Sequence, residues 1–232
     1  MSFSKDEVIF TFCDNIYFHK FAKAFIFSSL KYKNATHIHI VNPDEDCLAL
    51  LQKTQATSAD FSYSTSSYDF SACSVAFTKA YFICARFLLI PSLFAKNKNL
   101  KLLMFDADCL VRQKIQMPNK PLGLFLRVAN KNEHLKVLAS VFYMDIRAMQ
   151  YLKQVNQYIK QIGIKWFTDQ IALHRAYQNI SNQQDVFVFD KAFHSVEFDQ
   201  NAPTWAAKGD LKFENNAFNE EVRQYEALPY LS

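Results

Sequence analysis

Unbroken apolar runs alternate along this chain with segments in which apolar residues recur at helical spacing. The runs cover residues 8–13, 37–41 and 100–105, and each has the length of a strand. An apolar run without alternation is typical of a strand that is buried on both faces of a parallel sheet. Because such strands alternate with helices from the start of the chain, the pattern predicts an α/β fold with a mostly parallel central sheet.

The same patterns predict the other elements. Helical spacing covers residues 16–30, 44–52, 77–88, 146–162, 166–177 and 219–228. Further strands are predicted at 121–128, 137–144, 186–189 and 193–198, and residues 203–212 are strand-like but irregular. Residues 54–74 are predicted to be mostly loop, with room for a short strand at 61–64. Gly163 is expected to end one helix and Thr168 to cap the next. In the helix at 77–88, a buried stripe is expected to comprise Phe77, Tyr81, Cys84 and Leu88, with Lys79 and Arg86 on another face.

Two carboxylates end the third apolar run. Asp106 and Asp108 follow residues 100–105, and in an extended segment side chains two residues apart point to the same side. In open α/β sheets, ligands bind beyond the carboxyl ends of the strands. Two carboxylates there suit a Mg²⁺ or Mn²⁺ ion that takes its other ligands from water and substrate phosphates. The acidic residues 44–46 follow Pro43 instead, and they indicate the start of a helix.

The composition narrows the class of protein. At 232 residues the chain is long enough for one domain with a large core, and half of its residues are hydrophobic. With 3 glycines it lacks the glycine-rich phosphate loops of dinucleotide-binding and P-loop proteins. A net charge of +4 without a basic stripe argues against binding to nucleic acid and is compatible with an anionic substrate.

Cysteine spacing and hydropathy bear on the location of the protein. The five cysteines form no Cys-x-x-Cys pair, so we expect no disulfide framework and no zinc site, but reduced thiols in a cytoplasmic protein. Residues 1–7 lack the apolar core of a signal peptide. The apolar stretch at 75–94 carries Lys79, Arg86 and Pro91, which argues against a transmembrane segment but allows peripheral contact with a membrane.

Four motifs occur in an order that resembles a known family. They are Asp14-Asn15-x-Tyr17 after the first strand, Tyr81-x4-Arg86 in a helix, Phe105-Asp106-Ala107-Asp108, and Trp166-x2-Asp169-Gln170. Over about residues 8–177 they resemble the nucleotide-sugar glycosyltransferases of the GT-A fold, similar to glycosyltransferase family 8 and its bacterial relatives. The resemblance implies a three-layer α/β/α sandwich in a single catalytic domain over residues 1–232. Its nucleotide-binding part would cover about 1–112, and its sugar and acceptor part about 113–232.

The resemblance also implies a donor site. Asp106 and Asp108 would hold a Mn²⁺ or Mg²⁺ ion that bridges the diphosphate of the sugar nucleotide, because negative charge builds up there as the glycosidic bond breaks. Arg86 would pair with Asp106 or with the phosphates. The nucleotide would be contacted by the residues after the first strand, which are Asp14, Asn15 and Tyr17.

Other implied site residues come later in the chain. Asp169 and Gln170, together with Arg86, would approach the transferred sugar or the acceptor hydroxyl. Lys208, Gly209 and Lys212 resemble the late loop that closes over the diphosphate, where two ammonium groups and a backbone N–H suit an anion. Family 8 enzymes usually supply a third metal ligand from a His-x-x-Gly-x-x-Lys-Pro-Trp segment. This chain has no such segment, and its nearest histidine is His194.

The function expected from these residues is transfer of a hexose from a UDP-sugar or similar donor to a glycan, lipid-linked or protein acceptor. One alternative is a haloacid dehalogenase-like phosphatase, whose first motif also places Asp-x-Asp after an apolar strand. That motif usually opens the catalytic domain, however, and Leu110 stands where such enzymes have Thr or Val. Another alternative is a domain that binds a sugar nucleotide without turnover.

Overall fold

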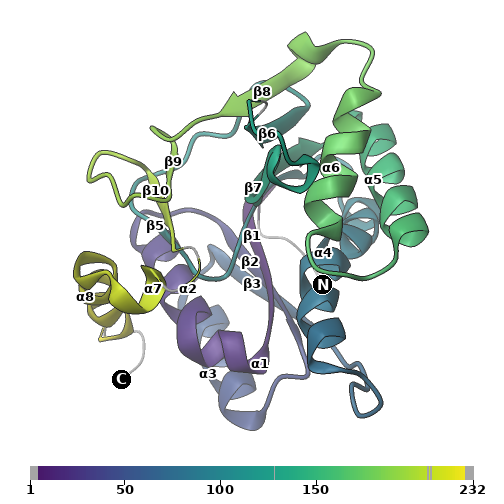
Figure 1. The fold of residues 1–232 in the computed structure, drawn as a ribbon. Coiled ribbons are helices and arrows are strands. Elements are labelled where there is room, and N and C mark those ends of the chain that lie inside the picture. The colour runs from purple at the N-terminus through teal and green to yellow at the C-terminus, as the bar shows by residue number, and fades with distance from the viewer. Residues whose placement is uncertain (1–4, 128, 208, 210, 228–232) are drawn as a thin grey trace. The chain divides into compact units, whose positions relative to one another are not determined.

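The computed structural model describes residues 5–127, 129–207, 209 and 211–227. The chain divides into two compact units, and each gathers residues that are far apart in the sequence (Figure 1). The first unit comprises Met1–Ser67, Met104–Gln116 and Asp190–Ser232. The second unit comprises Tyr68–Leu103 and Met117–Phe189.

Seven strands form one sheet in the order β3-β2-β1-β4-β7-β6-β8. The strands are β1 (Glu7–Asp14), β2 (Thr36–Val41), β3 (Phe61–Ser66), β4 (Lys101–Phe105), β6 (Leu122–Leu126), β7 (Val137–Asp145) and β8 (Val186–Phe189). β1 is parallel to β2, β2 to β3 and β6 to β8, whereas β6 and β7 are antiparallel. The predicted α/β fold with a mostly parallel sheet is therefore confirmed.

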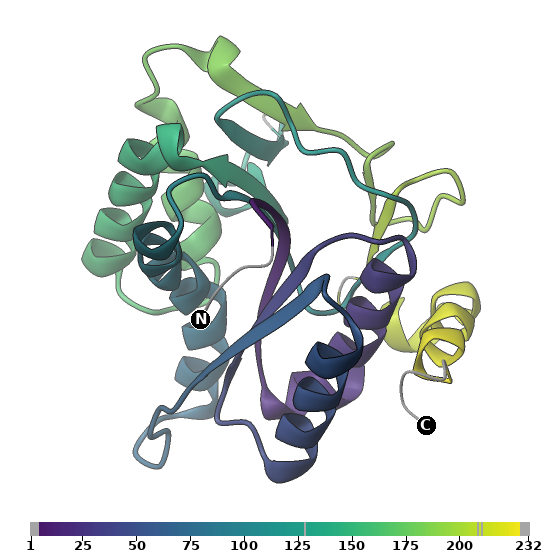
Figure 2. The ribbon, with the colours of Figure 1, turned by 180° about the vertical axis from the view of Figure 1, so that it is seen from behind.

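In the first unit, β1 is followed at once by helical structure. The predicted helix at 16–30 consists of α1 (Asn15–Tyr17), a π-helical turn (Phe18–Ala22) and α2 (Lys23–Lys31). α3 (Glu45–Thr57) begins after Asp44, whose Oδ1 accepts a hydrogen bond from the Cys47 N–H at 2.8 Å, so these acidic residues do start a helix. Figure 2 shows α2 and α3 beside the strands of this unit.

A second, three-stranded sheet lies in the first unit. It has the order β5-β10-β9 and consists of β5 (Cys109–Val111), β10 (Thr204–Ala206) and β9 (His194–Ser195). The strand predicted at 193–198 is thus only two residues long, and β10 lies within the strand-like but irregular segment 203–212. After β10 come α7 (Leu211–Glu214) and α8 (Asn216–Glu226), and α8 packs against α2.

The second unit holds the longer helices. They are α4 (Val75–Lys96), α5 (Met149–Ile162) and α6 (Thr168–Gln178). Gly163 ends α5 with a positive φ of 84°, as predicted. The prediction that Thr168 caps α6 is wrong, because Phe167 holds the cap position and the Thr168 hydroxyl instead donates to the Gly163 carbonyl at 2.9 Å.

α4 buries a different face from the one that its spacing predicted. Cys84 is buried and Phe77 and Tyr81 are half-buried, but Leu88 is 37% exposed while Arg86 is 5% exposed. Arg86 can be buried because it has a carboxylate partner, described below. Within the described residues, α4 is the one helix long and apolar enough to cross a membrane, a property shared by core helices of soluble proteins, and 44% of its most apolar window is buried.

An alternating ladder of histidines and serines joins β2 to β3 in the first unit. His37 bonds Ser62 through Nδ1 (2.8 Å) and Ser64 through Nε2 (3.0 Å). His39 bonds Ser64 through Nδ1 (2.7 Å) and Ser66 through Nε2 (3.0 Å). Because Ser64 donates to one ring and accepts from the other, the two neutral rings must share one tautomer. The ladder thus gives all four ring nitrogens of the two imidazoles a hydroxyl partner.

This ladder predicts a pH-dependent stability. Burial lowers the pKa of His39 from its ordinary 6.5 to about 4, so the unfolded chain takes up the proton first as the pH falls. The contribution of neutral His39 to the unfolding free energy is fully present above pH 6.5. It is lost as the pH falls from 6.5 towards 4, and the total loss is about 3 kcal/mol. We expect His39→Gln to flatten the decline in unfolding free energy between pH 7 and 4.5, measured by urea denaturation. Equal slopes for the variant and the parent chain would contradict this.

Candidate functional site

The acidic pair lies in a turn of the first unit, which we call the acidic turn (Asp106–Cys109). β4 ends at Phe105, whose carbonyl accepts a hydrogen bond from the Thr11 hydroxyl at 3.0 Å. The Cys109 N–H then donates to the Asp106 carbonyl at 3.1 Å, and β5 leaves to pair with β10. Asp106 and Asp108 are therefore not in the extended segment that we predicted, because they lie in the turn between β4 and β5, which belong to different sheets.

Lys212 of α7 forms an ion pair with the acidic turn. Its Nζ lies 2.9 Å from Asp108 Oδ2, and 12% of each of these two side chains is exposed. The same ammonium donates to the Tyr17 hydroxyl at 3.1 Å and lies 5.2 Å from the centre of the Tyr17 ring and 5.0 Å from that of Phe21. Lys212 thus contacts both Tyr17, which was also predicted to bind the donor, and Asp108, which was predicted to bind a metal ion.

The charges of this ion pair depend on each other. Burial raises the pKa of the Asp108 carboxyl, the charge of Asp106 raises it further, and the Lys212 ammonium partly offsets both effects. Burial alone would lower the pKa of Lys212, but the charge of Asp108 and the hydrogen bonds to Asp108 and Tyr17 outweigh it, so this pKa is raised. Lys212 is therefore a cation at neutral pH.

The residues predicted to contact the nucleotide follow β1. Asp14 caps α1, because its Oδ1 accepts from the Tyr17 N–H at 2.6 Å. Asn15 donates through Nδ2 to Asp44 Oδ2 at 2.7 Å, and His19 Nε2 lies 3.0 Å from the same oxygen. Asp14 and Asn15 thus have structural partners, while the Tyr17 ring is 39% exposed.

Gly209 keeps a conformation suited to a tight loop. Its φ of +55° is left-handed, and a Cβ placed on it would meet nothing within 4 Å. Its backbone is therefore accessible, as a loop over a diphosphate requires. Lys208, predicted for the same loop, lies outside the described residues.

A second group of predicted residues meets in the second unit, at the start of α6. Arg86 Nη2 lies 3.0 Å from Asp169 Oδ2, and the two side chains are 6% and 4% exposed. The Arg86 Nε also donates to the Ile83 carbonyl at 3.2 Å. The structure thus gives Arg86 a buried partner in Asp169, and its predicted pairing with Asp106 or with phosphate stays a prediction.

Gln170 is held by backbone carbonyls. With its amide oriented to satisfy both ends, its nitrogen donates to the Val137 carbonyl at 2.8 Å and to the His134 carbonyl at 3.1 Å. Gln170 therefore ties the start of α6 to the hairpin that joins β6 and β7. Arg127, which sequence reasoning missed, lies beside it with its Nη2 3.5 Å from the Gln170 side chain. The predicted strand at 121–128 included Arg127, whereas β6 ends at Leu126, so the place of Arg127 just after a strand was not visible in the sequence.

No family profile and no curated protein matches the sequence, but solved structures match the fold. The glycosyltransferase GlyE of Streptococcus pneumoniae TIGR4 is 13% identical to this chain, with a TM-score of 0.63. The match covers 98% of this chain but only 61% of GlyE, so this chain spans about three fifths of GlyE's length. The galactosyltransferase LgtC, crystallised with donor and acceptor sugar analogs, is 14% identical, with a TM-score of 0.64 over 96% and 97% of the two chains. A glycosyltransferase involved in glycosylation of the major capsid of PBCV-1 is 12% identical, with a TM-score of 0.53 over 94% and 99%.

The chain has a GT-A-type glycosyltransferase fold. The resemblance stated from the four motifs is thereby confirmed at the level of the fold. At these identities the likeness concerns architecture, so the chemistry has to be argued from the residues of this chain.

The donor set of the acidic turn fits a divalent cation only in part. Asp106 and Asp108 offer carboxylate oxygens, and among the described residues no group of three or more His, Cys, Asp or Glu side chains could hold a metal. His194 is buried, bonds Thr204 Oγ1 through Nδ1 at 2.9 Å and packs on the Phe105 ring. Mg²⁺ and Mn²⁺ accept one or two carboxylates when phosphate and water complete the set, so two carboxylates suffice in a GT-A fold that binds a diphosphate.

Alanine stands at the position for which the resemblance implies a third metal ligand. Gly209 and Lys212 keep the spacing of the glycine and lysine in the His-x-x-Gly-x-x-Lys segment, which places Ala206 at the histidine position. Ala206 pairs with Cys109 across β10 and β5, so it adjoins the acidic turn. The sequence-based search looked for a histidine and missed this alignment, because a methyl group gives no chemical signal.

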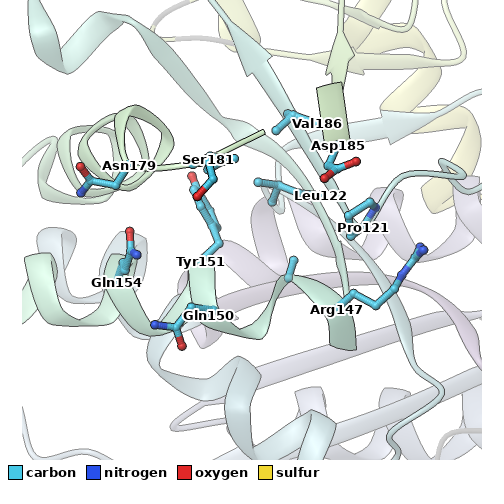
Figure 3. A pocket seen from close by; sticks show the side chains of 12 residues that line it. Pro121, Leu122, Arg147, Gln150, Tyr151, Gln154, Asn179, Ser181, Asp185 and Val186 are labelled. Atoms are coloured by element: carbon cyan, nitrogen blue, oxygen red, sulfur yellow. The ribbon is translucent and has the colours of Figure 1, made fainter. Parts of the chain in front are cut away.

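A separate cavity lies in the second unit (Figure 3). It has a volume of about 250 Å³ and is lined by α5, the end of α6 and the starts of β6 and β8. Gln150, Gln154 and Asn179 contribute amide side chains to its wall, and Leu122 and Val186 contribute apolar ones. None of the site residues predicted from the sequence lines it.

The buried pair at α6 predicts a large loss of stability when one partner is neutralised. Asp169→Asn leaves the Arg86 guanidinium buried opposite a neutral amide, which should cost about 3 kcal/mol or more in unfolding free energy. Glu197→Gln is the control, because Glu197 pairs with Lys191 and these side chains are 69% and 67% exposed. It should cost less than about 1 kcal/mol. Equal losses for the two variants in urea denaturation would contradict this assignment.

Proposed function

We propose that this chain transfers a hexose from a UDP-sugar or similar nucleotide-diphosphate sugar to a hydroxyl of a glycan, lipid-linked or protein acceptor. The acidic turn with its Lys212 ion pair, at the end of β4 in a GT-A fold, is the observation that carries the proposal. Carboxylates and an ammonium gathered there suit a reaction whose leaving group is an anionic diphosphate. We place the protein in the cytoplasm, in keeping with its five cysteines, which form no disulfide bond.

The proposed donor site is in the first unit. The exposed ring of Tyr17 offers a stacking surface for a base, and Lys212 offers a compact cation for phosphate oxygens. Asp106 and Asp108 would hold a Mn²⁺ or Mg²⁺ ion that supplies charge stabilisation at the departing diphosphate. A cation on Asp108 would weaken that carboxylate's attraction for Lys212, and the ammonium could then turn to the phosphates.

The proposed sugar and acceptor site is in the second unit. Asp169 and Gln170 stand next to each other at the start of α6, and both are fixed, one by Arg86 and the other by two carbonyls. Side chains fixed in this way can hold a sugar hydroxyl in one orientation, and orientation contributes strongly to the rate of group transfer. This fixation supports a role for the start of α6 in positioning the transferred sugar or the acceptor.

A product assay distinguishes this function from its two alternatives. The purified chain would be incubated with Mn²⁺ or Mg²⁺ and either a panel of UDP-sugars or simple phosphoesters, and UDP, free sugar and orthophosphate would be measured. We expect UDP and sugar from one or more UDP-sugars, and no orthophosphate from phosphoesters. Asp106→Asn and Asp108→Asn should each lower the rate about 100-fold or more, because they remove charge from the proposed cation site.

Asp46→Asn is the matched control, because Asp46 is an exposed acid in the first turn of α3 and should leave the rate unchanged. Orthophosphate release from phosphoesters would favour the phosphatase. Binding of UDP-sugars without any turnover would favour the non-catalytic domain. Full activity of the Asp106→Asn chain would sink the proposed mechanism.

A further inference from the structure

Arg127 follows β6 directly, at the base of the hairpin that connects β6 to β7 in the second unit. Its N–H donates to the Lys136 carbonyl at 2.7 Å, which fixes the backbone at this point. The side chain is half-buried beside Gln170, at the start of α6. Arg127 is therefore held on a fixed backbone next to the proposed sugar and acceptor site.

The guanidinium of Arg127 lacks a carboxylate partner within the described part of the chain. Its Nε is buried without a hydrogen bond there. The nearest side-chain atom to its Nη2 that could serve as an acceptor is the terminal amide of Gln170, at 3.5 Å. When Gln170 is oriented to donate to the two backbone carbonyls, the amide atom that faces Arg127 is the nitrogen, which cannot accept a hydrogen bond. Arg127 thus has unused donors that are partly removed from water.

The other three arginines of this unit differ in this respect. Arg86 pairs with Asp169, Arg147 with Asp145 and Arg175 with Glu133. Burying a cation without a partner is costly, and proteins ordinarily avoid it. The exception at Arg127 therefore indicates that the partner is supplied by a ligand.

The surrounding charge favours an anionic ligand. Residues 127–136 contain three permanently cationic side chains and one acidic side chain, Glu133, which gives 3 − 1 = +2. Glu133 is already engaged by Arg175 at 2.9 Å. Burial also lowers the pKa of Arg127, as expected for a cation without a compensating charge.

The geometry points to Arg127 as the binding residue for a carboxylate or phosphate group carried by the acceptor or by the transferred sugar. A planar guanidinium with free donors matches the two oxygens of either group, whereas a neutral hydroxyl would leave its charge uncompensated. This inference rests on the proposed function for its choice of substrate, and it adds that one of the two substrates is acidic at this end.

Binding can be measured without turnover, so that its failure is distinguishable from failure of the proposed function. The Nε–H resonance of Arg127, assigned by its loss in Arg127→Lys, would be followed by NMR during titration with methyl glucuronide, inorganic phosphate and methyl glucoside. We expect the resonance to shift with at least one of the two anions and not with the neutral glucoside. Absence of a shift with both anions, or an equal shift with the glucoside, would overturn the inference.

Arg127→Gln should weaken binding of the effective anion about 10- to 100-fold, as expected for the loss of a charge-assisted hydrogen bond. Its melting temperature without ligand should be unchanged or raised, because no protein partner is lost. A lowered melting temperature together with unchanged anion binding would show a structural role instead. Arg147→Gln is the control, since Arg147 is already paired with Asp145 and lines the separate cavity, and it should not change anion binding.

Two further arms identify the source of the acidic group. If the transferred sugar carries it, Arg127→Gln should selectively raise the KM for UDP-glucuronic acid and not for UDP-glucose. If the acceptor carries it, the variant should selectively raise the KM for a glucuronate-terminated or phosphorylated acceptor. Equal changes for acidic and neutral substrates in both arms would contradict the inference.

Discussion

The donor site that we propose for this protein depends on holding two carboxylates close together in a tight turn. Like charges repel, and burial makes the ionised form of Asp108 costlier still. The structure offsets this with Lys212, an ammonium 104 residues further along the chain, whose own burial is tolerated only because Asp108 lies 2.9 Å away. Each charge therefore makes the other possible, and the C-terminal segment is tied to the end of β4.

This dependence connects the fold with its chemistry. The acidic turn exists because β4 and β5, which follow each other in the chain, belong to two sheets: β4 ends in the large sheet and β5 pairs with β10. β10 in turn leads through Gly209 to α7, so the sheet that shapes the turn also delivers the ammonium. Alanine at position 206 adjoins the turn through its pairing with Cys109 and brings no metal-ligating group to it.

In the second unit, the start of α6 is organised by two arginines in different states. Arg86 is buried with Asp169 and stabilises the helix start, whereas Arg127 has donors that no described side chain satisfies. The same residue type thus serves stability in one place and, by our inference, recognition in another. The difference between the two arginines is that Arg86 has a carboxylate partner and Arg127 has none among the described residues.

The sequence predicted the order of the elements well, because apolar runs and helical spacing report burial directly. Six of the seven strands of the large sheet lie at apolar runs, and the seventh, β3, lies in a Ser- and Thr-rich stretch that was predicted to be mostly loop. The sequence-based predictions were wrong where burial or backbone conformation depends on a partner that is distant in the sequence. Leu88 is exposed and Arg86 buried on α4 because Asp169, 83 residues away, supplies a counter-charge. The acidic pair does follow β4, but it lies in a turn and not in the extended segment that was predicted. The turn forms because β5 pairs with β10 in a second sheet, and the sequence of β10 has no clear strand pattern. Arg127 was missed because an absent partner cannot be seen in a sequence.

The central claim is that the acidic turn and Lys212 together receive the diphosphate of a nucleotide sugar. A crystal structure with Mn²⁺ and UDP bound, with the metal located by its anomalous signal, tests this most directly. The account predicts a Mn²⁺ peak coordinated by Asp106 and Asp108, with the diphosphate beside it and Lys212 turned from Asp108 to a phosphate oxygen. Nucleotide density remote from the acidic turn, with the Lys212–Asp108 ion pair intact, would contradict it.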